Sequence, residues 1–342
     1  MIFPRSVVLE LTYKCNHHCK FCSCPWYAPH SAYPIGEELS VCDWKRAVDR
    51  LYAAGVTHFS ISGGEFLLKE GYEEILRHVR TEGNKRGLNS PIVAISNGRI
   101  MTEDALRLFK ELNVHLSMSL PCYSTFEEHT GVDNADGVLH WFQVANRIGL
   151  KTTVNVTVTS KNYNELFQTL SLGLIHGAND ILLNRFLPGG RGLAYMDELS
   201  LTPEQVNGML DTAEEVLTYA KRYGNVGTEI PLCSIKSTKK YERIHIGYHC
   251  AAAKEFFVID PSGIIRTCNH SPHTVGHVFS EQMIEDADYW NTFANSDYHP
   301  SMCSDCKLIS ICDCGCREVA NILHGSPKQI DTSILKDKVS SS

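Results

Sequence analysis

Short apolar runs, rich in β-branched residues, alternate with amphipathic stretches over the first two-thirds of the chain. The amphipathic pattern is clearest in residues 41–54, where Ser40 and Asp43 have capping-box spacing and Gly55 ends the apolar stripe. This alternation predicts βα units and a parallel sheet. The expected strands are residues 7–11, 57–62, 92–96, 114–120, 152–159 and 180–185.

Six βα units are too few for a closed eight-stranded barrel. The pattern fits an open, six-stranded partial barrel, although the residues by themselves also allow a doubly wound sheet. After a helix predicted from Thr202 to about Tyr223, the βα rhythm stops near Gly224 and a cysteine-rich segment begins. We therefore expect a core at residues 1–224, a second domain at residues 225–330 and a disordered tail at residues 331–342.

Composition narrows the classes of function. The 342 residues carry a formal net charge of −7 and no long basic run, which argues against a nucleic acid or an anionic membrane as partner. The N-terminal residues have no secretory pattern, and no apolar run reaches membrane-spanning length. We expect a cytoplasmic protein, whose fourteen cysteines point to metal or redox chemistry rather than to disulfides.

Three cysteines with C-x3-C-x2-C spacing, Cys15, Cys19 and Cys22, directly follow the first predicted strand. Three thiolates can hold a four-iron cluster and leave one iron open; a zinc knuckle is the simpler alternative. The spacing and position resemble the radical S-adenosylmethionine (SAM) family. The resemblance implies a (β/α)6 partial barrel, SAM bound to the open iron, and its cleavage to a 5′-deoxyadenosyl radical that abstracts hydrogen from a substrate carbon.

Polar residues at the ends of later predicted strands extend this resemblance. Gly63, Gly64 and Glu65 match the family's GGE motif, which lies against the methionine part of SAM, and glycine permits close backbone approach to a ligand. A turn is the ordinary explanation for such a pair of glycines. By their place in the fold, the further candidate SAM contacts are Asn97, Ser119, Asn155 and Arg185, with Arg191 an alternative to Arg185 as a carboxylate partner.

The C-terminal cysteines resemble the SPASM extension of radical SAM enzymes, which binds auxiliary iron–sulfur clusters. By that resemblance, a first cluster takes Cys250, Cys268 and Cys316, with Cys233 as the upstream fourth thiol. A second cluster takes Cys303, Cys306 and Cys312. No cysteine follows Cys316, so the fourth ligand of the second cluster stays open, and the candidates are Cys314, His324, Asp331, water or substrate.

We therefore predict an oxidoreductase that uses a [4Fe–4S] cluster, SAM and one or two auxiliary clusters. Cys122, after the fourth predicted strand, is a candidate hydrogen-atom donor, and Cys233 is a second. By analogy with relatives, the substrate is a peptide or protein side chain, with oxidation or bond formation as the outcome. The short N-terminus favours the alternative of a sugar or other small molecule that is dehydrogenated, epimerised or decarboxylated. A reductase such as flavodoxin or ferredoxin is the expected electron donor. The third hypothesis is a non-catalytic iron–sulfur or zinc protein.

Overall fold

The computed structural model describes residues 3–237 and 240–334. Its centre is one eleven-stranded sheet with the strand order β11-β10-β9-β1-β2-β3-β4-β5-β6-β7-β8. The strands are β1 Ser6–Glu10, β2 His58–Ser62, β3 Ile92–Ser96, β4 Val114–Ser119, β5 Thr152–Val158, β6 Asp180–Arg185, β7 Gly224–Val226, β8 Ile244–Ile246, β9 Phe256–Ile259, β10 Ile264–Arg266 and β11 Gly276–His277.

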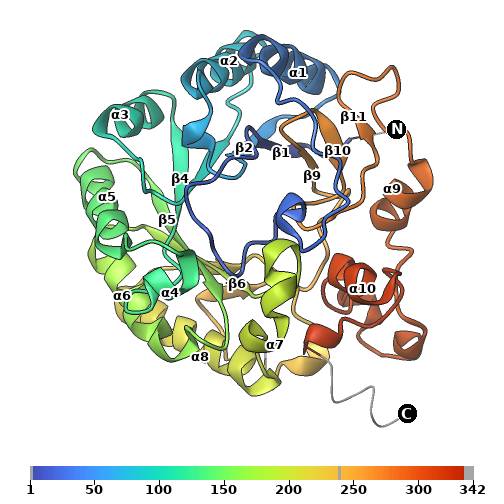
Figure 1. Ribbon diagram of the computed structural model, residues 1–342. Helices are drawn as coiled ribbons and strands as arrows, with labels where there is room; N and C mark the ends of the chain where they lie inside the picture. Colours follow the sequence, from blue (N-terminus) through green and yellow to red (C-terminus); the bar gives the residue numbers. More distant parts are fainter. Residues whose placement is uncertain (1–2, 238–239, 335–342) are drawn as a thin grey trace.

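The longer helices lie outside a curved, open sheet (Figure 1). The α-helices of the described residues are α1 Val41–Ala53, α2 Tyr72–Lys85, α3 Glu103–Glu111, α4 Phe126–Thr130, α5 Ala135–Arg147, α6 Leu166–Ile175, α7 Met196–Leu199, α8 Pro203–Ala220, α9 Ala287–Ala294 and α10 Arg317–His324. The 3-10 turns in the described part of the chain are η1 Pro25–Tyr27, η2 Phe66–Leu68, η3 Tyr163–Glu165, η4 Gly190–Tyr195, η5 Leu232–Ser234, η6 Ser301–Cys303 and η7 Ile309–Ile311.

Hydrophobic burial explains why the helices dock on the sheet. Trp44 and Leu51 of α1 are fully buried, as are Phe109 of α3 and Phe142 of α5, and all four belong to one continuous core. Burying each such side chain stabilises the fold by roughly 1.5–3 kcal/mol. The α1 cap forms as expected, because the Ser40 side chain accepts a hydrogen bond from the Asp43 backbone N–H.

Strands β1 to β6 confirm the predicted parallel βα core, and the sheet is open rather than closed. The open sheet also resolves the choice between a partial barrel and a doubly wound sheet, since β1 to β6 are neighbours in chain order. Their carboxyl ends meet on one face, where loops carry the functional groups of barrel enzymes. The dark blue loop after β1 crosses the middle of the ring in Figure 1.

The prediction that the alternation of strands and helices ends near Gly224 is wrong in one respect. β7 and β8 continue the parallel sheet beyond β6, and β9 pairs in parallel with β1 at the opposite side. The segment at residues 225–330 therefore shares the sheet of the core. β7 and β8 have only three residues each, too few for an alternating pattern to mark them in the sequence.

The prediction of a disordered tail at residues 331–342 does not hold for its first residues. Asp331 is fully buried, and Ser333 and Ile334 are also buried. Asp331 forms an ion pair with Arg185 of β6. Residues 335–342 lie outside the described part of the chain. Within the described part, no helix is long and apolar enough to cross a membrane.

Candidate functional site

The loop after β1 brings three thiols to the carboxyl end of the strand. A turn joins the last two of them, since Cys22 N donates to Cys19 O at 3.2 Å. The η4 segment holds the loop from outside: the Arg191 guanidinium donates to Cys19 O at 3.1 Å, and Gly192 N donates to Cys22 O at 3.2 Å. The loop conformation is therefore set by contacts with a segment 170 residues later in the chain as well as by its own turn.

The electrostatics of these thiols fit a cationic cluster. Burial raises the pKa of Cys15 to about 11 and raises that of Cys19 well above its ordinary value. The negative charge of Cys22 raises both pKa values, and Arg191 lowers them. For Cys22, a hydrogen bond from Cys24 lowers the pKa to about 7. Three crowded thiolates need more positive charge than one guanidinium supplies, and iron in a cluster would supply it.

The glycines after β2 pack directly against this loop. Gly64 N donates to Thr12 O and Glu65 N donates to Lys14 O, both at 2.8 Å. A Cβ atom on Gly64 would lie 2.2 Å from Lys14 O, and one on Gly63 would lie 2.9 Å from Thr12 O. Only glycine permits this approach, because the obstructing atoms belong to the backbone.

Glu65 and Asn97 connect the same region to β3. The Glu65 carboxylate is buried and accepts hydrogen bonds from Asn97 N at 2.7 Å and Ser96 Oγ at 3.0 Å. Burial raises its pKa to about 7. The Asn97 side chain donates to Asn16 Oδ1 at 2.7 Å and lies 3.8 Å from Cys15 Sγ. The Asn97 side chain therefore lies beside the thiol loop. The Glu65 carboxylate instead uses its hydrogen bonds to connect the segment after β2 with the end of β3.

The remaining predicted SAM contacts divide into two groups. Ser119 at the end of β4 and Asn155 in the middle of β5 are register partners, and both are half-buried. Asn155 Oδ1 accepts a hydrogen bond from Asn184 at 2.9 Å. Arg185 instead faces the C-terminal segment. Its guanidinium donates to Glu229 O at 3.0 Å and to Ser333 Oγ at 3.0 Å, and it pairs with Asp331. The expected role of Arg185 at SAM is corrected by this geometry, because all three of its donor groups have other partners.

A second group of thiols lies deep in the C-terminal part. Cys250, Cys268 and Cys316 lie close enough for their charges to interact, and burial raises the pKa of each. Three of the thiols predicted for the first auxiliary cluster therefore lie near one another, and their role as its ligands stays a prediction. Glu229, which the sequence analysis missed, acts on all three cysteines and raises their pKa values. No cysteine spacing or other local pattern marks this glutamate.

A third group of thiols surrounds Cys312. Cys314 hydrogen-bonds to Cys303 and Cys312, and the charges of Cys233 and Cys306 act on Cys303. Leu232 N donates to Cys312 Sγ at 3.5 Å. The expectation that Cys233 joins the first auxiliary set is corrected here, because η5 places it beside the second.

The other candidate ligands and the candidate hydrogen donor have structural partners. His324 Nε2 lies 2.9 Å from Thr332 Oγ1, and Asp331 accepts a hydrogen bond from Cys316 N at 2.9 Å. Cys122 has no exposed surface and belongs to the hydrophobic core, which raises its pKa to about 12. The thiol therefore does not face the open end of the sheet as expected, and hydrogen donation by Cys122 loses its geometric basis.

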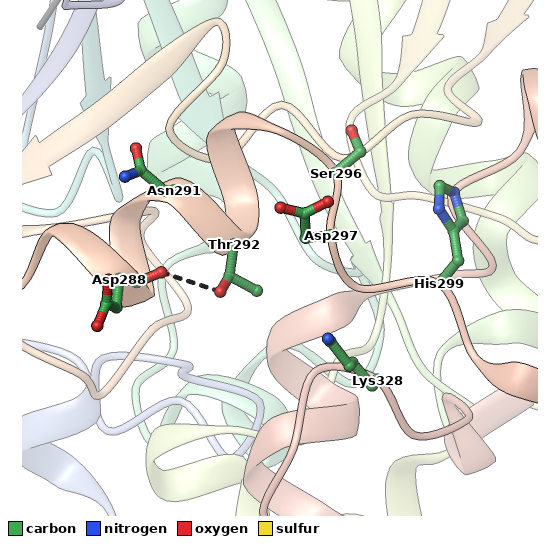
Figure 2. A pocket seen from close by; sticks show the side chains of 7 residues that line it. All are labelled: Asp288, Asn291, Thr292, Ser296, Asp297, His299 and Lys328. Carbon is green, nitrogen blue, oxygen red and sulfur yellow. Dashed lines mark hydrogen bonds between the residues drawn. The ribbon is translucent and has the colours of Figure 1, made fainter.

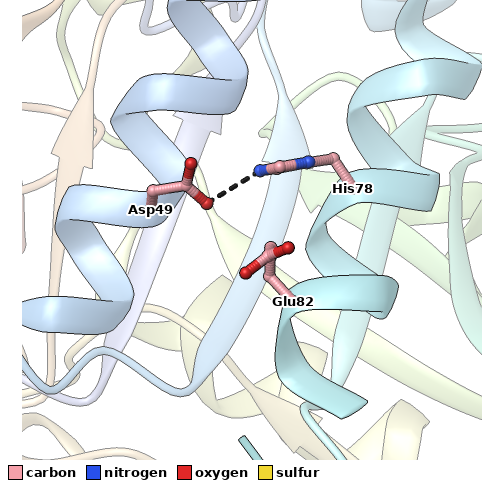
Figure 3. A group of neighbouring side chains, drawn as sticks. All are labelled: Asp49, His78 and Glu82. Carbon is pink, nitrogen blue, oxygen red and sulfur yellow. Dashed lines mark hydrogen bonds and ion pairs between the residues drawn. The ribbon is translucent and has the colours of Figure 1, made fainter. Parts of the chain in front are cut away.

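Two polar groups lie apart from the thiols. A polar hollow of about 610 Å³, lined by α9 residues and by His299 and Lys328, opens to solvent near α10 (Figure 2). Asp49, His78 and Glu82 meet between α1 and α2, with ligand atoms within 4.8 Å of one another (Figure 3). Ion pairs account for this cluster: His78 faces Asp49 at 2.8 Å, and Glu82 pairs with Lys85 and Arg86 at 2.6 Å.

The spacing of the thiols bears on the zinc alternative. Tetrahedral zinc with Zn–S bonds of ~2.3 Å keeps its sulfurs about 4 Å apart. In the described part of the chain, no three cysteine sulfurs lie within 4.8 Å of one another. Among the described residues, no group of three cysteines therefore has the spacing that one zinc ion requires.

An open parallel α/β barrel, with thiols at its carboxyl face and more thiols in a C-terminal extension, defines a class of iron–sulfur barrel enzymes. Residues 9–172 match the sequence model described as the radical SAM superfamily. This match indicates a radical SAM enzyme, a class that needs a [4Fe–4S] cluster and SAM.

Relatives cover nearly the whole chain. The PqqA peptide cyclase of Xanthomonas campestris pv. campestris is 26% identical over 96% of this chain and 86% of its own length. The Rhodopseudomonas palustris protein of the same name is 25% identical over the same shares. Among solved structures, Streptococcus suis SuiB bound to its precursor peptide SuiA has a TM-score of 0.72 at 18% identity, covering 97% of this chain and 75% of SuiB. The anSMEcpe structure with bound AdoMet has a TM-score of 0.75 at 14% identity, covering 98% and 95%.

Proposed function

We propose that this enzyme modifies a side chain of a peptide or protein through a carbon-centred radical. In this proposal, Cys15, Cys19 and Cys22 hold the [4Fe–4S] cluster at which SAM binds. When bound, the cluster and SAM together supply a 5′-deoxyadenosyl radical after the input of one electron. A flavodoxin or ferredoxin would provide that electron.

The backbone approach at Gly64 is the observation that carries this proposal. It places a stretch of backbone without side chains beside the loop of the three thiols, where a methionine moiety on the open iron would lie. Asn97 reaches the same loop, and Ser119 at the end of β4 and its register partner Asn155 on β5 add polar groups. These residues would bind and orient SAM without taking part in bond breaking.

The peptide substrate is supported by the relatives. PqqA peptide cyclases are named for acting on a peptide, SuiB has been solved with the precursor peptide SuiA, and anSMEcpe has been solved with peptides bound. Loss of one hydrogen atom to the radical, followed by loss of one electron and one proton, would remove two hydrogens from the substrate. The auxiliary clusters are a chemically suitable acceptor for that electron.

The first test measures SAM cleavage. Anaerobically reconstituted protein, reduced with dithionite, should release 5′-deoxyadenosine from SAM, and Cys15→Ala should lower the rate at least ~100-fold because one cluster ligand is lost. Cys42→Ala is the matched control, since Cys42 is exposed on α1. Equal rates in Cys15→Ala and the wild type would contradict the assignment of the thiols.

The second test identifies the substrate class. Peptides encoded beside this gene, incubated with the enzyme, SAM and reductant, should lose about two mass units per modification, as the removal of two hydrogens requires. The same assay with free sugars in place of peptides is the comparison. Turnover of a sugar, with every peptide unchanged, would contradict a peptide substrate and favour the small-molecule alternative.

A further inference from the structure

A cavity opens at the amino end of the barrel, where β3, β4 and β5 begin. Its volume is about 290 Å³, and it is lined by residues 89–93, 113–115 and 149–151 together with Lys110. These strands run parallel to β1 and β2, so the cavity lies at the end of the sheet opposite the thiol loop. Barrel enzymes place their active sites at the carboxyl end. The amino-end cavity is therefore separate from the site described above.

The inner face of β4 carries polar side chains beside this cavity. Leu116 and Met118 are fully buried in the apolar core. Successive strand residues point to opposite faces of a sheet, so His115 and Ser117 point away from that core. The helices lie outside the curved sheet, so this polar face is the inner one (Figure 1). Ser117 is buried, and its hydroxyl has no hydrogen-bond partner among the described residues. The inner face next to the cavity thus has unused hydrogen-bonding capacity.

His115 lines the cavity, and a hydrogen-bond chain across three strands orients its ring. Thr153 on β5 donates its hydroxyl proton to the Asp180 carboxylate on β6. The Thr153 oxygen therefore accepts a hydrogen bond from His115 Nε2, which lies 2.6 Å away. With the proton on Nε2, the other ring nitrogen, Nδ1, is a hydrogen-bond acceptor. Burial lowers the pKa of His115, which keeps the ring neutral near pH 7. None of the described residues donates a hydrogen bond to Nδ1.

The charged groups at the cavity wall are cationic. Lys110 from α3 and Lys151 from the loop before β5 line it, and among the described lining residues there is no carboxylate. Lys110 Nζ donates to Gly149 O at 2.6 Å, which holds the ammonium group at the rim. The lysines favour a negatively charged ligand, whereas His115 Nδ1 needs a hydrogen-bond donor. One ligand satisfies both requirements only if it carries a donor next to its negative charge.

We propose that the amino-end cavity binds a small anion that carries a hydroxyl group beside its charge, such as hydrogenphosphate or the phosphate ester of a polyol. Lys110 and Lys151 attract the anionic oxygens, and His115 Nδ1 accepts a hydrogen bond from the hydroxyl group. Thr153 and Asp180 are positioning residues, because they keep Nδ1 free as the acceptor. This binding site does not depend on the proposed function, since no thiol contributes to it.

Isothermal titration calorimetry of the full-length protein at about pH 7.5 tests the ligand chemistry. Hydrogenphosphate and sulfate have the same shape and nearly the same charge, but sulfate has no hydroxyl group. We expect one phosphate per chain, bound at least ~10-fold more tightly than sulfate, because sulfate would leave Nδ1 without a donor. Glycerol phosphate in place of phosphate shows whether the ester or the free ion is the better ligand. The absence of binding by either, or equal affinities for phosphate and sulfate, would overturn the proposal.

Variants test the residues. His115→Phe should weaken phosphate binding at least ~10-fold, whereas His140→Phe, at an exposed histidine of α5, is the matched control and should not. Thr153→Val keeps the imidazole but removes its orienting partner, so it should also weaken binding. Cys15→Ala should bind phosphate as the wild type does, because the thiol loop lies at the other end of the strands. Unchanged binding in His115→Phe, or lost binding in Cys15→Ala, would overturn the site, and unchanged binding in Thr153→Val would overturn the positioning role.

Discussion

At the scale of single residues, the carboxyl face of the sheet depends on Gly64. The close contact between Gly64 and Lys14 lets two loops from neighbouring strands share one surface. A side chain there would push the backbone just before Cys15 outward.

We therefore expect Gly64→Ala to lower the rate of 5′-deoxyadenosine release at least ~10-fold and to destabilise the protein by roughly 1–3 kcal/mol, as overpacking does. Gly247→Ala is the control, because its Cβ would lie 3.3 Å from the nearest atom. Cleavage assays and chemical denaturation measure the two effects. Full activity in Gly64→Ala would show that the contact is dispensable.

At the scale of elements, Glu65 joins η2 to the end of β3. Its side chain accepts hydrogen bonds from Leu67 N on one side and from Ser96 and Asn97 on the other. Burial opposes its ionisation, so the folded protein holds a proton on Glu65 up to about pH 7.

This shift gives stability a pH dependence. The unfolded chain releases the proton near pH 4.5 and the folded protein near pH 7, so the contribution of Glu65 to the free energy of unfolding falls as pH rises between these values. Glu65→Gln cannot ionise, and its stability relative to the wild type should rise by on the order of 2 kcal/mol from pH 5 to pH 7.5. Denaturant unfolding at a series of pH values checks this. If the stability difference between Glu65→Gln and the wild type stayed the same at every pH, the raised pKa of Glu65 would be contradicted.

At the scale of the whole molecule, buried polar contacts attach the C-terminal segment to the barrel. Asp331 pairs with Arg185 on β6 and caps Cys316 N, so it ties the last described residues to both the sheet and a thiol group. Arg266 on β10 and Glu10 on β1 form a second buried ion pair between the two parts of the sheet.

Removal of residues 331–342 should therefore lower the free energy of unfolding by about 3–5 kcal/mol, because Arg185 would keep a buried charge without its partner. Removal of residues 335–342 alone keeps Asp331, Ser333 and Ile334, and so keeps the partner of Arg185. Denaturant unfolding of the two truncated proteins compares them. Equal stability of both would contradict a structural role for Asp331.

The sequence alone determined the parallel core and the nature of its chemistry. Strands β3 and β6 lie where the apolar runs predicted them, since local periodicity marks strands of five or six residues. The cysteine spacing and the glycine pair indicated the superfamily because both are local patterns.

Only the tertiary structure decided which distant residues meet. Arg185 turned to Asp331, 146 residues away in the chain, and Cys233 lay with Cys312 rather than Cys250. No local sequence pattern marked Glu229 as a neighbour of the C-terminal cysteines. Pairings of this kind depend on how the curved open sheet and the folded C-terminal segment bring remote stretches of backbone together, and no short window of sequence records this.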